Sequence, residues 1–263
     1  MKRIALLLVL TLTGSLLWAQ QTQGRIVYER TSKLRIQIGG DNPAFSNAIP
    51  QERKDRFELL FANNQTLWRA MPDMGEDEMS FGGEGAQIRL VMPGSQDISF
   101  SDLPEMRKVD YRELFGKNFL VADTINRLNW KLSDETKEIL GHKCRKATSS
   151  RTQASMRMNN DNGVITRQEV TDTLEIIAWF ATDMPVFAGP LIYQGQLPGA
   201  VLEVTEGDRV SIVAVEISDK VDTKEIKEPK GGKKITQAEF VKEREKMMKE
   251  MQENGGMQFR MRN

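Results

Sequence analysis

The sequence predicts a mainly β protein: a single large antiparallel sheet, curved like a half-barrel, with a C-terminal α-helix. Three observations lead to this fold class. Apolar and polar residues alternate with a period of two in many short segments, which is typical of strands with one buried face. Turn signals containing Asn, Gly and Pro separate these segments. A helix start with explicit capping residues occurs only in the charged stretch 223–263.

The first residues have the order of a secretory signal peptide. Lys2 and Arg3 precede the apolar residues 4–12, and the small residue Ala19 ends the segment. The apolar run is shorter than the ~20 residues that a membrane-spanning helix needs. No cysteine follows it that could carry a lipid, because Cys144 is the chain's one cysteine. We therefore expect an exported protein, periplasmic or secreted, that is not a lipoprotein and has no transmembrane anchor after signal cleavage.

Composition and charge bound the rest of the chain. One cysteine cannot form a disulfide within the chain, so a hydrophobic core must stabilise the protein. The 37 basic and 37 acidic residues balance, and no nucleic-acid partner is expected. After the signal peptide (1–19), we expect one antiparallel β domain over residues 20–222. A charged linker, a helix and a disordered tail are expected over residues 223–263.

The first predicted elements are a strand and a hairpin. Alternation predicts a strand over residues 25–36 and two paired strands within 53–71. The Asn-Asn pair that begins at Asn63 is expected to form the turn of this hairpin, because asparagine tolerates positive φ. The stretches 39–50 and 72–86 are rich in Gly, Pro and short polar residues, and we expect both to be loops.

Two further hairpins are expected in the middle of the chain. The segment 118–152 predicts one hairpin that turns through Asp134 and Glu135 and returns near 142–148. The Asn-rich piece 159–163 predicts the tip of the other.

The following strands carry the clearest alternation. The segment 172–185 has an apolar residue at every second position over Leu174, Ile176, Ala178 and Phe180. The segment 201–221 predicts a hairpin that turns at residues 206–208.

The helix start is explicit in the sequence. Thr236 and Glu239 have the spacing of a capping box, and Ile235 and Phe240 that of a hydrophobic staple. Two glycines at 255–256 are expected to end the helix. Three methionines extend its apolar face: Met247, Met248 and Met251.

The stretch GPLIYQGQLPGAVLEV, residues 189–204, poses a question of role. It contains no Ser, Cys, His or Lys, so it offers little for catalysis beyond Tyr193 and Glu203. Proline at Pro198 and glycine at Gly199 predict a type II turn with positive φ at the glycine. Glu203, between apolar neighbours in a strand, is expected to face solvent or to form a salt bridge. The sequence favours an architectural corner.

This stretch resembles the signature of the GLPGLI family, secreted proteins of Bacteroidetes-type bacteria, whose run reads close to GPxxYxGLPGLILE. The resemblance covers residues 20–250 and includes a segment around a lone cysteine. It implies an exported antiparallel β protein similar to curved half-barrels that shield lipids or apolar ligands, and it implies no chemistry. The matching residues are Gly189, Pro190, Tyr193, Gly195, Leu197, Pro198, Gly199, Leu202 and Glu203.

The favoured function is a non-enzymatic exported binding or accessory protein of the bacterial envelope. It would hold an apolar ligand or an envelope partner protein on the curved sheet, and no cofactor is expected. Aromatic residues in the β segments would pack in the core or line an apolar concavity. These residues are Trp68, Trp130, Trp179, Phe180 and Tyr193.

Two alternatives remain open. His142 and Cys144 are two apart on a predicted strand, so they share a face and could bind a soft metal with help from methionines. The methionines concerned are Met71, Met74, Met79, Met156 and Met158. An enzyme of unrecognised type is the other alternative, although no nucleophile, base and carboxylate constellation is readable around the single histidine.

Overall fold

The structure, a computed structural model, describes residues 22–33, 52–71, 78–81, 88–91, 97–161, 164–185 and 187–253. The predicted signal peptide, the predicted loop 39–50 and the predicted tail beyond the helix lie outside the described residues. Within the described part of the chain, no helix is long and apolar enough to cross a bilayer.

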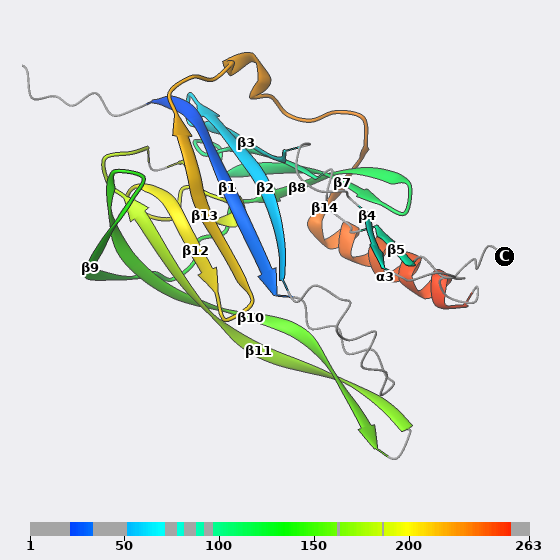
Figure 1. The fold of residues 1–263 in the computed structure, drawn as a ribbon. Helices are drawn as coiled ribbons and strands as arrows, with labels where there is room; N and C mark the ends of the chain where they lie inside the picture. The colour runs from blue at the N-terminus through cyan, green and yellow to red at the C-terminus, as the bar shows by residue number, and fades with distance from the viewer. Residues whose placement is uncertain are drawn as a thin grey trace, which may run out of the picture.

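Most of the described chain is β-strand (Figure 1). The strands are β1 (Gln23–Lys33), β2 (Glu52–Ala62), β3 (Gln65–Ala70), β4 (Glu78–Phe81), β5 (Ile88–Val91), β6 (Ile98–Asp102), β7 (Arg107–Leu114), β8 (Lys117–Thr124), β9 (Lys131–Ile139), β10 (His142–Asp161), β11 (Val164–Ala181), β12 (Ala200–Glu206), β13 (Val210–Ser218) and β14 (Lys233–Thr236). The remaining elements are two short 3-10 helices, η2 (Leu191–Tyr193) and η3 (Thr223–Glu225), and the helix α3 (Gln237–Glu253).

Twelve of these strands form one sheet, in the order β14-β8-β7-β6-β3-β2-β1-β13-β12-β11-β10-β9. Neighbouring strands are antiparallel except β14 and β8, which are parallel. The two terminal strands of this order do not pair with each other, so the sheet stays open. The predicted fold class, a mainly β protein with one large curved sheet and a C-terminal helix, is confirmed.

Three predicted turns are confirmed. Asn63 and Asn64 join β2 to β3 with φ of 52° and 59°. The hairpin of β10 and β11 closes between Asp161 and Val164, inside the predicted tip. Gly207, with φ of 55°, lies between β12 and β13.

The predicted turn at Asp134 and Glu135 is wrong. Strand β9 runs through both residues, and the chain turns instead at Leu140 and Gly141, with φ of 50° and 82°. The polar residues face outward because β9 is the edge strand of the sheet, and a register shift opposite them lengthens β9 locally. Polarity on an edge strand therefore imitated a turn signal.

Two other segments also differ from expectation. Part of the predicted loop 72–86 is strand β4, which pairs with β5 in a separate two-stranded sheet. The predicted linker contains β14, whose approach to β8 depends on Gly232: a Cβ there would lie 2.8 Å from the carbonyl carbon of Phe119. β5 follows β4 closely in sequence, whereas β8 lies far from β14, so no local pattern could signal the pairing of β14.

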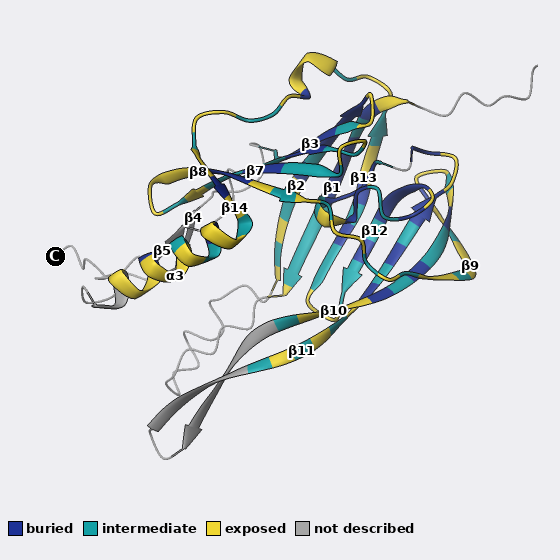
Figure 2. Cartoon of the chain, turned by 180° about the vertical axis from the view of Figure 1, so that it is seen from behind, coloured by how far each residue is buried: buried dark blue, intermediate teal, exposed yellow. Residues whose placement is uncertain are grey.

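The largest buried cluster shows how the sheet curves. It joins side chains from β2 and β3 to side chains from β9 and β10, which are far apart in the strand order. The Tyr28 hydroxyl of β1 donates a 2.8 Å hydrogen bond to the Val201 carbonyl of β12, although β13 lies between these strands. Figure 2 shows buried residues gathered along these strands and exposed residues along α3. The sheet therefore bends around this cluster, which is the largest of the buried clusters in the described part of the chain.

Helix α3 begins as predicted. The Thr236 amide donates to the Glu239 carboxylate at 2.7 Å, and the Glu239 amide donates to the Thr236 hydroxyl at 3.2 Å. Ile235 and Phe240 are buried in one cluster against β8. The side chain of Met251 lies outside what the structure describes.

The predicted methionine face of α3 is only partly correct. Met247 is buried, seven residues after Phe240, but Met248 is 50% exposed. A step of one residue turns the side chain by about 100° around a helix, which carries Met248 off the face that packs on the sheet.

Candidate functional site

The motif segment, residues 189–204, lies between β11 and β12 and packs on the sheet it connects. Six of the nine family-matching residues are buried: Gly189, Pro190, Tyr193, Leu197, Gly199 and Leu202. Of the other three, Gly195 and Glu203 are half-buried and Pro198 is exposed. Of these nine residues, only Pro198 is exposed, and the segment also exposes Ile192. Its role as an architectural corner stays a prediction.

The predicted type II turn at Gly199 is wrong. The φ angle of Gly199 does not lie in the left-handed region. The nearby Gly195 does have such an angle, with φ of 65°. Glycine is needed at position 199 for another reason. A Cβ there would lie 2.2 Å from the carbonyl oxygen of Ala181 and 3.0 Å from the Cα of Thr182. The end of β11 and the start of β12 meet so closely that a side chain has no room.

Tyr193 anchors the segment through a buried hydrogen bond. Its hydroxyl donates to a Glu206 oxygen at 2.5 Å, and the other Glu206 oxygen accepts a 2.9 Å bond from Arg151 of β10. Its ring contacts Trp130 edge to face, with centroids 6.2 Å apart. Burial raises the pKa of Tyr193 well above its usual value, and the adjacent Glu206 carboxylate raises it further by a smaller amount. The Tyr193 hydroxyl therefore stays protonated near neutral pH.

Two glutamines attach the segment to distant parts of the chain. Gln194 is buried and accepts a 2.5 Å hydrogen bond from the Thr66 hydroxyl of β3. Gln196 donates to the Asn126 carbonyl at 2.7 Å and accepts from the Leu128 amide at 2.9 Å. The sequence analysis assigned neither glutamine a structural role. Two amide side chains within the otherwise apolar run LIYQGQL were the available signal.

Glu203 forms a salt bridge, one of its two predicted settings. Its carboxylate accepts a 2.6 Å bond from Lys137 of β9, and the Lys137 ammonium lies 4.5 Å from the centre of the Trp179 ring. The pair holds the outer strand β9 against β12 across two intervening strands.

The two metal candidates occupy different settings. Nδ1 of His142 lies 2.8 Å from the Asp183 carboxylate, whereas Cys144 is fully buried in the interior cluster. The Cys144 thiol donates weakly to the His142 carbonyl at 3.5 Å. In the described part of the chain, no three His, Cys, Asp or Glu side chains converge as metal ligands. Of the candidate methionines, Met71 contacts Arg25 at 3.8 Å, and the side chains of the others lie outside the described residues.

The Cys144 thiol is expected to be unreactive in the folded protein. Burial, followed by the Asp183 charge, raises its pKa from 9.0 to about 11. Because the folded state holds the thiol proton more tightly, this contribution to stability is complete below about pH 9 and is lost as the pH rises toward about 11. Ellman's reagent at pH 8 should therefore titrate one thiol in urea and none in native protein. Rapid native labelling would contradict this.

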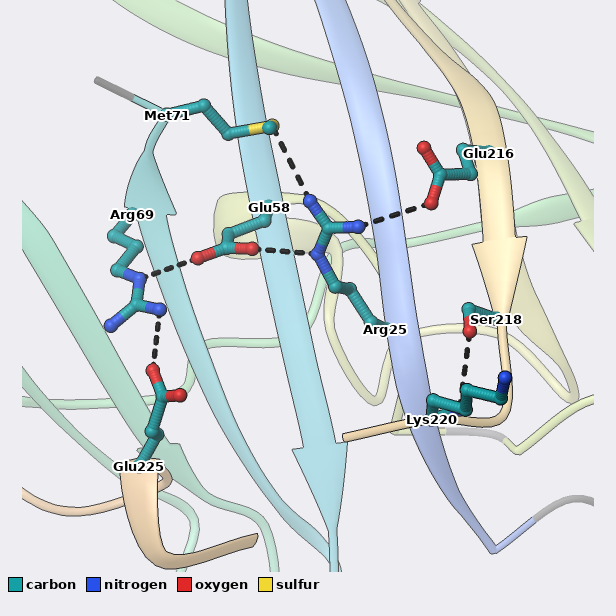
Figure 3. Close-up of polar contacts among 8 residues, drawn as sticks. All are labelled: Arg25, Glu58, Arg69, Met71, Glu216, Ser218, Lys220 and Glu225. Atoms are coloured by element: carbon teal, nitrogen blue, oxygen red, sulfur yellow. Dashed lines mark hydrogen bonds and ion pairs between the residues drawn. The ribbon is translucent and has the colours of Figure 1, made fainter. Parts of the chain in front are cut away.

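A chain of ion pairs crosses one face of the sheet (Figure 3). Glu58 of β2 accepts from Arg25 at 2.7 Å and from Arg69 at 2.6 Å. Arg25 also reaches Glu216 of β13 at 3.0 Å, and Arg69 reaches Glu225 of η3 at 2.6 Å. Burial alone would raise the pKa of Glu58, but its hydrogen bonds to both arginines outweigh burial and hold the pKa below its usual value. This series of ion pairs attaches η3 to the sheet, and with it the segment that leads to β14.

A two-stranded arm formed by β10 and β11 extends away from the rest of the sheet (Figure 1). Beyond Thr148, β10 pairs with no described strand on its β9 side, and the residues of β11 that precede Glu175 pair with no described strand on its β12 side. The two strands continue to pair with each other up to Asp161 and Val164. We call residues 151–161 and 164–174 the arm. At 3.4 Å per residue it is about 37 Å long.

The comparisons with known proteins agree with this description at the level of the fold. A family model described as a protein of unknown function, Porph_ging, matches residues 130–203, from β9 to the motif segment. Its name indicates Bacteroidetes-type proteins, and the resemblance to the GLPGLI family stays a prediction. No curated protein matches the chain.

Two of the solved structures that are similar to the chain are those of PNGF-II. "Structure of PNGF-II in P21 space group" is 14% identical with a TM-score of 0.50, and the match covers 86% of this chain and 34% of that one. "Structure of PNGF-II in C2 space group" is 13% identical with a TM-score of 0.50, covering 84% and 32%. The chain thus spans about a third of the length of these structures, and the likeness concerns the fold alone.

Proposed function

We propose that this chain is an exported, non-enzymatic binding or accessory protein of the bacterial envelope that engages a partner protein through its arm. The observation that carries the proposal is the continuation of β10 and β11 beyond their last neighbours, with both outer edges open to pairing among the described strands.

An isolated two-stranded ribbon is only marginally stable in water, and a third strand is normally needed for independent stability. Open strand edges also invite pairing, and proteins usually guard them with charged residues. The edge strand β9 follows this rule, with Lys131, Asp134, Glu135, Lys137 and Glu138 in nine residues. Each strand of the arm, residues 151–161 and residues 164–174, contains three charged residues and neither lysine nor proline. The arm is thus a long and weakly guarded pairing edge.

The interior of the sheet favours a partner protein over an apolar ligand. The connection between β11 and β12 places Met184 and Ala188 in the interior cluster, both essentially without exposed surface. Phe187 and Leu191 pack against the same cluster. The chain's own side chains therefore occupy the apolar side of the curved sheet, where a lipid-shielding half-barrel would hold its ligand.

Export is the second part of the proposal, and it rests on the signal-peptide pattern of residues 1–19. Cell fractionation followed by N-terminal sequencing tests it. A mature N-terminus at or near Gln20 in the periplasm or medium supports it, and Met1 retained in a cytoplasmic fraction contradicts it.

A shortened arm tests partner binding. Residues 152–173 would be replaced by Asn-Gly, because Arg151 and Leu174 are directly opposite and a two-residue type I′ turn can join them. The described side chains of the arm lie outside the buried clusters, so the melting temperature should stay within a few degrees of wild type. Cross-linking in the native envelope, followed by native mass spectrometry, should show a protein complex for wild type and only free chain for the variant. A complex retained without the arm, or a bound lipid in its place, would refute the proposal.

A further inference from the structure

We infer that the occupant of the arm is a second copy of this chain, paired antiparallel along the outer edge of β10 in a register centred on Met156. The inference rests on the proposed function, since it names the partner of the same arm. It follows from the sequence of the arm and the symmetry that two identical strands must obey.

Symmetry limits the registers. In a strand, successive residues direct their backbone N–H and C=O groups to alternate sides, and directly opposite residues of an antiparallel pair must be of the same kind. Two identical strands therefore pair only when the two-fold axis passes through a residue position. Pairing cannot extend past Thr148, because β9 occupies the edge of β10 from there on. A pairing of the arm residues 151–161 of both copies has its centre at Met156, and a pairing that also included residues 149 and 150 would have its centre at Ser155.

The charges of β10 favour the register centred on Met156. Centred on Met156, the pairing places Arg151 of each copy opposite Asp161 of the other, and opposite charges at such positions stabilise a sheet. Centred on Ala154, it would place Arg151 opposite Arg157, which is destabilising. Centred on Ser155, the pairing would place no opposite charges across from each other. Arg151 already contacts Glu206, but a guanidinium has five donors and can bind a second carboxylate.

The other strand of the arm is less suitable. The equivalent full-length pairing of β11 joins residues 164–174 and is centred on Glu169, which would lie opposite itself. Asp172 on the same strand adds to its negative charge. Pairing through β10 instead leaves the two β11 strands outermost in a four-stranded ribbon. Such an isologous contact closes with two copies and does not propagate.

A cysteine pair tests the register directly. In the proposed dimer Met156 faces its own counterpart, at a Cα separation of about 4.5–5.5 Å that suits a disulfide. Mild oxidation with Cu(II)-phenanthroline should therefore convert Met156→Cys almost completely to a covalent dimer. The matched control is Met158→Cys, whose counterparts would lie about 14 Å apart along the strands and should stay monomeric. Wild type should not cross-link, because its one cysteine, Cys144, is buried.

Sedimentation equilibrium of the chain purified from its own envelope supplies the second measurement. Wild type should sediment as a dimer, and Asp161→Arg, which reverses both cross-dyad charge pairs, should weaken dimerisation by about tenfold or more. Circular dichroism establishes that each variant keeps its fold. A monomeric wild type together with no cross-link at position 156 would overturn the inference. If the shortened arm then abolished a complex with a different protein, the proposed function would be supported and the dimer would be refuted. If no complex depended on the arm, both the proposed function and the dimer would be refuted.

Discussion

Replacing Gly199 by alanine is expected to lower the free energy of unfolding by about 3 kcal/mol, because the new methyl group would meet backbone atoms that cannot move aside. The nearest atom is the carbonyl oxygen of Ala181 at 2.2 Å. Relief requires β11 and β12 to separate where their pairing begins, at Ala181 and Ala200. Urea unfolding followed by circular dichroism should show a lower midpoint with little change in slope.

The matched control is Gly116→Ala in the turn between β7 and β8. Gly116 has φ of 76° and nothing within 4 Å of the position of a Cβ, so the substitution introduces backbone strain without a clash. Its cost should be about 1 kcal/mol. Equal effects of the two substitutions would show that the contact at Gly199 is not the source of its cost, and the close approach of the two strands would have to be abandoned as an explanation.

Removing the Tyr193 side chain is expected to cost about 4 kcal/mol, because Tyr193→Ala leaves a cavity in the cluster that covers β11 and β12. Tyr193→Phe keeps the ring and removes the buried hydrogen bond to Glu206, so it should cost about 2 kcal/mol. The pair of variants separates the ring from the hydroxyl in the same denaturation assay.

A surface substitution calibrates this second prediction. Phe115→Ala removes an aromatic ring that is 50% exposed at a hairpin tip, and it should change stability by less than about 0.5 kcal/mol. Should Tyr193→Phe prove as stable as wild type, the hydroxyl would contribute nothing and the Tyr193, Glu206 and Arg151 contacts would have to be discounted as an anchor.

Local patterns predicted what local physics determines. The Asn63 turn, the Gly207 turn and the Thr236 capping box depend on a few adjacent residues, and each lies where the sequence placed it. Alternation in β11 likewise predicted the buried residues Ile176 and Phe180. The prediction of a turn within β9 was wrong because the polar residues of this strand lie at an exposed edge of the sheet. The position of a strand in a sheet is a property of the whole fold.

The motif segment shows the same division. The sequence predicted a structural role for its glycines and prolines, but it assigned Gly199 a positive φ, whereas the constraint is a contact with Ala181 from another strand. The anchors of Tyr193, Gln194 and Glu203 lie on β12, β3 and β9, and no local pattern connects them. The arm was visible only as a hairpin tip, because its lack of neighbours follows from where β9 and β12 end.

The position of β1 in the middle of the sheet has a consequence for biogenesis. Its first partner, β2, follows closely in sequence, but its second partner is β13, and the ion pair between Arg25 and Glu216 spans 191 residues. The N-terminal strand therefore cannot be enclosed until nearly the whole chain has been synthesised, and such distant pairings fold slowly. For a chain that crosses a membrane before folding, as proposed, this delay is useful. The polypeptide stays unfolded while it passes through a translocation channel, and the sheet forms around β1 after the chain has crossed the membrane.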